Sequence, residues 1–136
     1  MKQIVASAFF ASALGALFLA GCAPQDKYAS VIAGSVPPSA EVKAKIVRNA
    51  KAIVYDPSSI RGAEISNMAT FADGTQGVCV KADVKNAQGK YLGVHTMGVA
   101  LNDDPHLAAN ALQHPVCDRA DVTWHPFPEL NHLKKR

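Results

Sequence analysis

Cysteine and histidine are the residue types in this chain best suited to chemistry. The 136 residues include three cysteines and five histidines, and four of the histidines fall between positions 106 and 132. A thiol can form a disulfide, accept a lipid, bind a metal or act as a nucleophile, and a neutral imidazole can bind a metal or transfer a proton. The sequence around each residue decides between these uses.

Cys22 follows a segment typical of exported proteins. A basic N-terminus precedes an apolar stretch over residues 4–20, which indicates a secretory signal peptide. Leu19-Ala20-Gly21-Cys22 resembles the bacterial lipobox, in which the cysteine receives diacylglycerol and the chain is cut just before it. We therefore expect residues 1–21 to be a lipoprotein signal peptide and Cys22 to be the lipidated first residue of the mature chain. The alternative is an ordinary signal peptide followed by a chance cysteine.

Cys79 and Cys117 are the two remaining thiols. In an exported and therefore oxidising compartment, such a pair most simply forms a disulfide. Two buried thiols or two metal ligands are the alternatives. A catalytic pair of Cys79 with His95 is disfavoured, because strand alternation places the two side chains on opposite faces of neighbouring strands.

The histidines near the C-terminus support an alternative function as a zinc- or copper-binding periplasmic lipoprotein. The candidate ligands are His106, His114, His125 and His132. Their spacings of 8, 11 and 7 residues match no compact ligand motif, so surface or partly packed histidines are the favoured interpretation.

Motifs of enzyme active sites are missing from the sequence. There is no glycine-rich phosphate loop, no G-x-S-x-G, no H-E-x-x-H and no C-x-x-C. Two acidic pairs, Asp103 with Asp104 and Asp118 with Asp121, are more typical of caps and turns than of acid–base catalysis. We predict no catalytic residue and no cofactor.

Charge and length limit the class of protein. The formal net charge of +3 equals the charge of the basic C-terminal residues Lys134, Lys135 and Arg136. This balance argues against a nucleic-acid-binding domain. The length and the 49% hydrophobic content predict one folded domain. We place a lipid-anchored tether at 22–38, the domain at 39–128 and a basic tail at 129–136.

An amphipathic helix is predicted from Ser39 to about Val54. Ser39 can cap the helix, and Glu41 lies in its first turn. Apolar residues recur with helical spacing and form one stripe, which predicts packing on a sheet. Asp56-Pro57 ends the helix, because the residue before a proline is disfavoured in the α conformation.

Three strands of an antiparallel sheet are predicted after this helix. The period of the apolar residues changes to two over 63–71 and over 78–85, and a loop at 86–89 leads into a strand over 90–101. Pairing across this loop opposes Val80 to His95 and Cys79 to Thr96. The last strand is apolar on both faces, so a further segment must cover the face that carries Cys79.

The C-terminal part is expected to supply that cover. Asp104-Pro105 predicts a short helix over 106–113 that Pro115 ends. Residues 122–127 form either an edge strand or an irregular segment. The predicted fold class is α+β, with an N-terminal amphipathic helix packed on an antiparallel sheet of about three strands and a short C-terminal helix. A bond from Cys79 to Cys117 would hold the C-terminal segment over the sheet.

A family resemblance adds to this interpretation. Asp56-Pro57-Ser58-Ser59, the Val78-Cys79 strand and the segment from Lys85 to Gly93 resemble the D-P-x-S, V-C and K-N-x-x-G-x-Y-x-G segments of small bacterial and prophage-encoded lipoproteins. The resemblance covers about residues 46–100 and implies location and fold class, without an activity.

These observations predict a structural or interaction module of the bacterial envelope. The domain would face the periplasm and attach to the outer membrane through the lipid on Cys22, with an envelope protein as a candidate partner. Ala23, rather than aspartate, after the cysteine favours the outer membrane over retention in the inner membrane.

Overall fold

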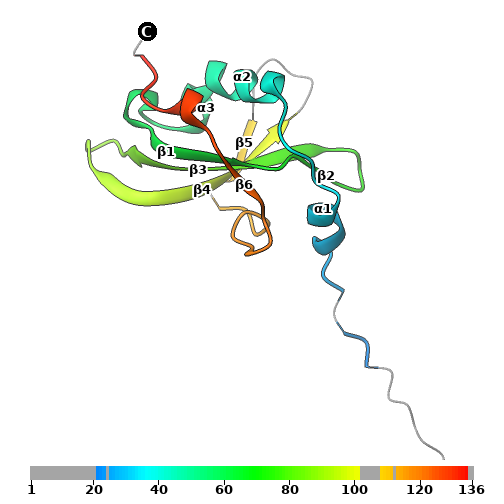
Figure 1. Ribbon diagram of the computed structural model, residues 1–136. Helices are drawn as coiled ribbons and strands as arrows, with labels where there is room; N and C mark the ends of the chain where they lie inside the picture. Colours follow the sequence, from blue (N-terminus) through cyan, green and yellow to red (C-terminus); the bar gives the residue numbers. More distant parts are fainter. Residues whose placement is uncertain (1–20, 24, 102–107, 112, 135–136) are drawn as a thin grey trace, which may run out of the picture.

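The computed structural model describes residues 21–23, 25–101, 108–111 and 113–134. Most of the predicted signal peptide, the acidic pair Asp103–Asp104, His106 and the last two residues lie outside the described residues. The described part of the chain folds mainly as β-structure (Figure 1).

The centre of the fold is a six-stranded antiparallel sheet. Its order is β5-β4-β3-β1-β6, and β2 also pairs with β3. The strands are β1 (Arg61–Ser66), β2 (Ala69–Thr70), β3 (Gln76–Lys85), β4 (Tyr91–Leu101), β5 (Ala108–Ala111) and β6 (Trp124–Pro126). The helical elements are α1 (Ala29–Ala33), α2 (Ala40–Arg48), α3 (Ala50–Ile53) and the 3-10 turns η1 (Pro57–Ser59) and η2 (Pro128–Leu130).

The predicted α+β fold, with one amphipathic helix on about three strands, is wrong. The sheet has six strands, and the expected helix is divided into α2 and α3. Ser39 caps α2 by accepting a hydrogen bond from the Val42 N–H. The division occurs at Asn49, whose side chain donates a hydrogen bond to the Lys45 carbonyl and so competes with helix propagation.

The predicted C-terminal helix over 106–113 is also wrong. Residues 108–111 form β5, which pairs with Gly98, Val99 and Ala100 of β4. The free edge of β4 offers unpaired backbone groups, and pairing with them outweighs the helix propensity of an alanine-rich segment. Near the C-terminus, Trp124–Pro126 forms the edge strand β6 beside β1.

The β3–β4 hairpin has a different register from the predicted one. Cys79 lies opposite Gly98, and Val80 lies opposite Met97, so the prediction was wrong by two residues. One residue of the difference comes from the loop, because Lys85 pairs with Tyr91 and the loop spans 86–90, where Gly89 has a φ of 74°. The other comes from the irregularity between Asp83 and Lys85. A shift of two residues keeps each side chain on its face.

The turn before β1 is bound to this hairpin. Ser59 is buried; its hydroxyl donates to the Asp56 carbonyl at 2.7 Å and accepts from the Lys85 N–H at 2.9 Å. The Tyr91 hydroxyl donates to the Ser59 carbonyl at 2.8 Å, and the Arg61 guanidinium lies 3.6 Å from the centre of the Tyr91 ring. Two segments of the family resemblance therefore meet in one hydrogen-bonded junction.

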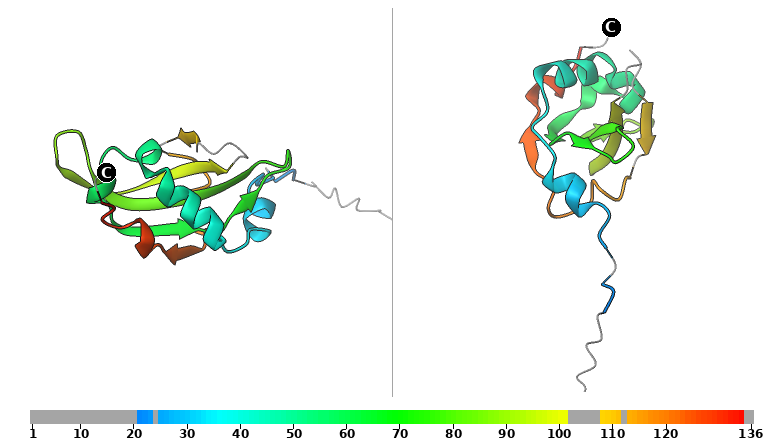
Figure 2. Two further views of the ribbon diagram at one scale, coloured as in Figure 1. Left: turned by 90° about the horizontal axis from the view of Figure 1, so that it is seen from above. Right: turned by 90° about the vertical axis from the view of Figure 1, so that its right-hand side faces the viewer.

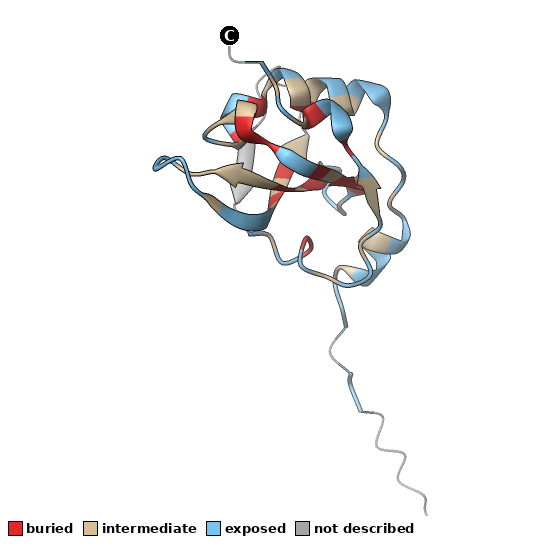
Figure 3. Ribbon diagram, turned by 60° about the vertical axis from the view of Figure 1, so that its left-hand side comes forward, coloured by how far each residue is buried: buried red, intermediate tan, exposed pale blue. Residues whose placement is uncertain are grey.

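The main core lies between one face of the sheet and the helices α2 and α3. Ile46, Ala50 and Ile53 from the helices pack with alternate strand residues, so the buried residues concentrate between these layers (Figure 3). The strand and turn residues of this core are Ile60, Ala63, Ile65, Val78, Val80, Ala82, Met97, Val99, Phe127 and Leu130.

The second face of the sheet carries α1 and the segment before β6. Figure 1 shows both on the side opposite α2 and α3, and Figure 2 shows the same layers from two further directions. α1 and the Val36–Met68 bridge place residues 28–36, which were expected in the tether, on the domain. Among the described residues, no helix is long and apolar enough to cross a membrane.

Candidate functional site

The predicted disulfide between Cys79 and Cys117 is confirmed. The two Cα atoms are 5.5 Å apart, and the cysteines are separated by 38 positions in sequence. Cys79 and Cys117 are buried with Val116 in a second, smaller apolar cluster that includes Tyr28, Ile32, Phe71 and Trp124 at its edge. In the chain-entropy model, a loop of this size stabilises the fold by about 4 kcal/mol.

Gly98 makes room for the covering segment. A Cβ atom at this position would lie 3.1 Å from the His114 Cβ and 3.9 Å from the Cys117 Sγ. Because Gly98 lies directly opposite Cys79 on the neighbouring strand, its missing side chain lets the disulfide segment approach the sheet.

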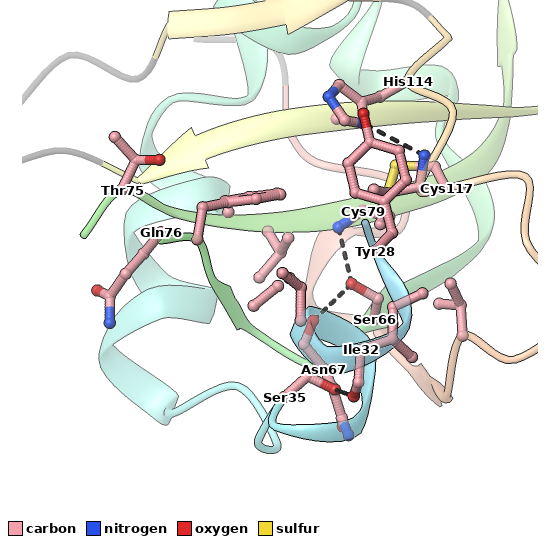
Figure 4. Close-up of a pocket in the computed structure, with 18 of the residues that line it drawn as sticks. Tyr28, Ile32, Ser35, Ser66, Asn67, Thr75, Gln76, Cys79, His114 and Cys117 are labelled. Atoms are coloured by element: carbon pink, nitrogen blue, oxygen red, sulfur yellow. Dashed lines mark hydrogen bonds between the residues drawn. A yellow bond between two sulfur atoms is a disulfide. The ribbon is translucent and has the colours of Figure 1, made fainter. Parts of the chain in front are cut away.

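A cavity of about 600 Å3 lies beside the disulfide, under α1. Its wall comes from α1, β2, β3, β4, the turn before β3 and the segment after β5 (Figure 4). Its apolar lining on this face of the sheet includes Val31, Ile32, Phe71, Ala100 and Val116. This volume is in the range of about 300–1,000 Å3 that is typical of small-molecule pockets.

Three polar side chains of the wall, Ser35, Ser66 and Asn67, are bonded within the protein. The Ser66 hydroxyl accepts from the Cys79 N–H at 2.8 Å and donates to the Asn67 carbonyl at 2.7 Å. The Ser35 hydroxyl donates to the Ile32 carbonyl, and the Asn67 side-chain oxygen lies 2.6 Å from His125 Nε2. The interior of the cavity therefore presents mainly apolar surface.

The rim of the cavity is polar. The Lys27 ammonium lies 4.9 Å from the centre of the Tyr28 ring, and both residues line the cavity. Asp73 lies in the turn before β3, where the Thr75 hydroxyl and N–H donate to its carboxylate. These hydrogen bonds, the hydroxyl first, lower the pKa of Asp73 below its usual value of 3.8.

An ion-pair cluster fastens the start of α1 to the covering segment. Arg119 pairs with Asp121 through two hydrogen bonds of 2.7–2.8 Å, and its other terminal nitrogen lies 2.6 Å from the Asp26 carboxylate. The hydrogen bonds to Arg119 hold the pKa of both carboxyls below the usual 3.8. Asp121 and then Asp26 raise the pKa of Arg119 above its ordinary value.

The histidine candidates are separated in the structure. His114 Nδ1 accepts a hydrogen bond from the Val116 N–H, His125 contacts Asn67, and His132 is exposed beyond η2. His106 lies outside the described residues. Within the part of the chain that the structure describes, no three histidine, cysteine or acidic residues form a group able to hold a metal ion.

The residues considered for catalysis have structural contacts. Cys79 is bonded to Cys117, and His95 is exposed opposite Ala82. Asp118 accepts a hydrogen bond from the Thr96 hydroxyl at 3.0 Å, and Asp121 belongs to the ion-pair cluster. Since a disulfide sulfur carries no thiolate, the Cys79 side chain cannot act as a nucleophile in this state.

Sequence reasoning missed the cavity. Tyr28 and Ile32 lie in the segment expected to be a tether, and Phe71 was assigned only to a strand. The one sequence signal that pointed here was the apolar second face of residues 90–101. The cover that this face required is partial, because Leu92 and Val94 remain 64% and 62% exposed.

Comparison of the chain with protein-family models, with curated proteins and with solved structures found no match.

Proposed function

We propose that this chain is a lipid-anchored bacterial envelope protein whose domain faces the periplasm and acts by binding a partner. The observation that carries the proposal is the sequence Leu19-Ala20-Gly21-Cys22 followed closely by a domain with a disulfide. A lipobox-like cysteine and a structural disulfide are both typical of exported proteins. The resemblance to small bacterial lipoproteins supports the same location, with the outer membrane as the favoured site.

The surroundings of Cys22 support attachment at this position. Cys22 is a free, exposed cysteine, and the described residues from 21 to 27 are exposed as well. The first helical residue, Ala29, follows seven positions later. A lipid on Cys22 would hold the domain close to the membrane without disturbing its core.

A binding role is favoured over catalysis by the contacts of the polar side chains. Arg61 pairs with Asp83, Lys81 pairs with Glu64, and Arg119 pairs with two carboxylates. In the described residues, these contacts bring no nucleophile together with a general base. Side chains of this kind tune association and stability.

Metabolic labelling tests the anchoring. Cells that express the full chain are grown with radiolabelled palmitate, and the protein is compared with the variants Cys22→Ser and Gln25→Ala. We expect label and membrane retention in the original chain and in Gln25→Ala, and neither in Cys22→Ser. Equal labelling of Cys22→Ser would contradict lipidation at this residue.

Crosslinking in intact cells tests the binding role. One dominant envelope protein, captured by the original chain and lost with Cys22→Ser, is the expected result. Single alanine substitutions of His95, His114, His125 and His132 should leave a deletion phenotype complemented. Loss of complementation from one such change, with export and folding intact, would contradict a pure binding function.

A further inference from the structure

We propose that the cavity under α1 binds a single linear acyl chain of a membrane lipid. The proposal rests on the proposed function in one respect, because a lipid on Cys22 would place the cavity beside the membrane that supplies this chain. Neither the lipobox nor the disulfide requires such a site, so it is a separate property of the domain.

The interior of the cavity selects for an apolar ligand. Ile32, Phe71 and Val116 line a volume of about 600 Å3 together with the buried disulfide. This arrangement is a defined pocket under a helix, and it differs from the open sheet surface at Leu92 and Val94. An apolar ligand that enters it releases water from both surfaces.

The polar groups of the wall disfavour a sugar, a nucleotide or a peptide. Ser35, Ser66 and Asn67 already have partners within the protein. Among the described residues, the one buried side-chain atom without a hydrogen-bond partner is Asp83 Oδ1, which is not part of the wall. A ligand with polar groups along its body would leave them unpaired in the cavity, and an acyl chain has none.

The rim fits the polar end of a lipid. Lys27 supplies a cation at the rim, and cations of this kind attract anionic headgroups. The carboxylate of Asp73, which also lines the cavity, accepts hydrogen bonds from the Thr75 N–H and hydroxyl. The acyl chain would therefore lie inside the cavity, with its headgroup at Lys27.

The short distance between Cys22 and the cavity rim favours a membrane lipid as the ligand. Lys27 follows Cys22 by five positions, and a segment of this length spans at most about 18 Å when fully extended. Figure 1 shows that the described part of this segment leaves the domain at α1, next to the cavity. Lipidation of Cys22 would thus hold the rim within reach of the bilayer surface.

Photo-crosslinking of the full chain in cells tests the proposal. The probe is palmitate that carries a diazirine near its methyl end, and adducts are mapped by mass spectrometry after irradiation. We expect adducts on cavity residues, chiefly in the peptides that contain Ile32, Phe71 and Val116. Ile32→Asp should reduce these adducts at least fivefold, because it places a charge in the apolar wall.

Ala33→Asp is the matched control, because Ala33 is the exposed next residue of α1. It should retain the adducts of the original chain. Val31→Trp is a second test variant, which fills the cavity without adding a charge and should reduce the adducts similarly. The linked Cys79–Cys117 peptide pair is measured in every variant, and it reports that the domain has folded.

The same spectra separate the possible outcomes. A lipid-bearing Cys22 peptide without adducts in the cavity overturns the acyl-chain site and leaves the anchoring intact. Undiminished adducts in folded Ile32→Asp and Val31→Trp also overturn it. A crosslink between the Cys22 peptide and a cavity peptide would show that the lipid on Cys22 occupies the cavity. This result would contradict a membrane lipid as the source of the bound acyl chain. Cavity adducts with an unmodified Cys22 support the site and contradict the anchoring.

Discussion

At the scale of single residues, Ser59 joins the turn before β1 to the β3–β4 hairpin. Its hydroxyl contacts both the Asp56 carbonyl and the Lys85 N–H, and the residue is 5% exposed. We expect Ser59→Ala to lower the free energy of unfolding by about 1–3 kcal/mol, because the partly buried Lys85 N–H loses its acceptor. Urea unfolding measures the change.

Tyr91→Phe is the matched control for Ser59→Ala. It removes only the hydroxyl that donates to the Ser59 carbonyl, so about 1 kcal/mol or less should be lost. Equal stability of Ser59→Ala and the original chain would contradict a structural role for this junction. The contact between the D-P-x-S and K-N-x-x-G-x-Y segments would then contribute nothing measurable to stability.

Gly98 is the second residue on which the architecture depends. We expect Gly98→Ala to destabilise the domain by about 1–3 kcal/mol, since the new methyl group would press against His114 in a segment fixed by the disulfide. Denaturant unfolding of the oxidised protein checks this. The double variant Gly98→Ala, His114→Gly removes the opposing Cβ and should recover part of the loss; no recovery would place the strain elsewhere.

At the scale of elements, the ion pairs of Arg119 join the segment before α1 to the segment that carries Cys117. Asp26 and Asp121 have lowered pKa values in the folded state, so their ionised carboxylates stabilise that state fully at pH values above the usual pKa of 3.8. This stabilisation is lost when the pH falls below 3.8 and the two carboxylates become protonated in the folded state. We therefore expect the amides of α1 to lose protection from hydrogen exchange at acidic pH before the core strands do.

The variant Arg119→Gln should uncouple α1 from this pH dependence. The pKa values of its Asp26 and Asp121 carboxyls should rise relative to the original chain, and the α1 amides should be less protected already at neutral pH. Arg48→Gln, a change on the exposed side of α2, is the control. The same acid profile in Arg119→Gln as in the original chain would contradict the coupling.

The sequence predicted elements well where local signals and burial agree. Val78, Val80 and Ala82 alternate with less apolar residues and are buried as one face of β3. The Ser39 cap is also present. Long-range pairing caused the errors: Ala108–Ala111 joins the edge of β4, and no local feature of an alanine-rich segment indicates such a partner. Similarly, the break at Asn49 depends on one side-chain hydrogen bond.

The candidate site was harder to predict than the fold. The disulfide followed from the compartment and the number of cysteines, whereas the cavity depends on α1, which has five residues and no side-chain cap. A helix this short is stabilised by its contacts, here through Ile32 and the Arg119 cluster. Its sequence therefore shows no sustained helical period.

At the scale of the whole molecule, the two faces of the sheet have different roles. One face packs with α2 and α3 and forms the main core. The other face carries the disulfide, the cavity and the start of the chain that leads to Cys22. The proposed acyl-chain site and the segment that leads to the proposed anchor therefore lie on the same face of the sheet.

The intact mass of the protein, purified from membranes without a reducing agent and treated with an alkylating reagent, tests the central claim most directly. The account predicts a chain that begins at Cys22, carries a lipid on that residue and takes up no alkyl group on Cys79 or Cys117. A chain that retains residues 1–21, or a Cys22 without lipid, would contradict anchoring at this cysteine. Two alkylated thiols would contradict the disulfide that holds the second face together.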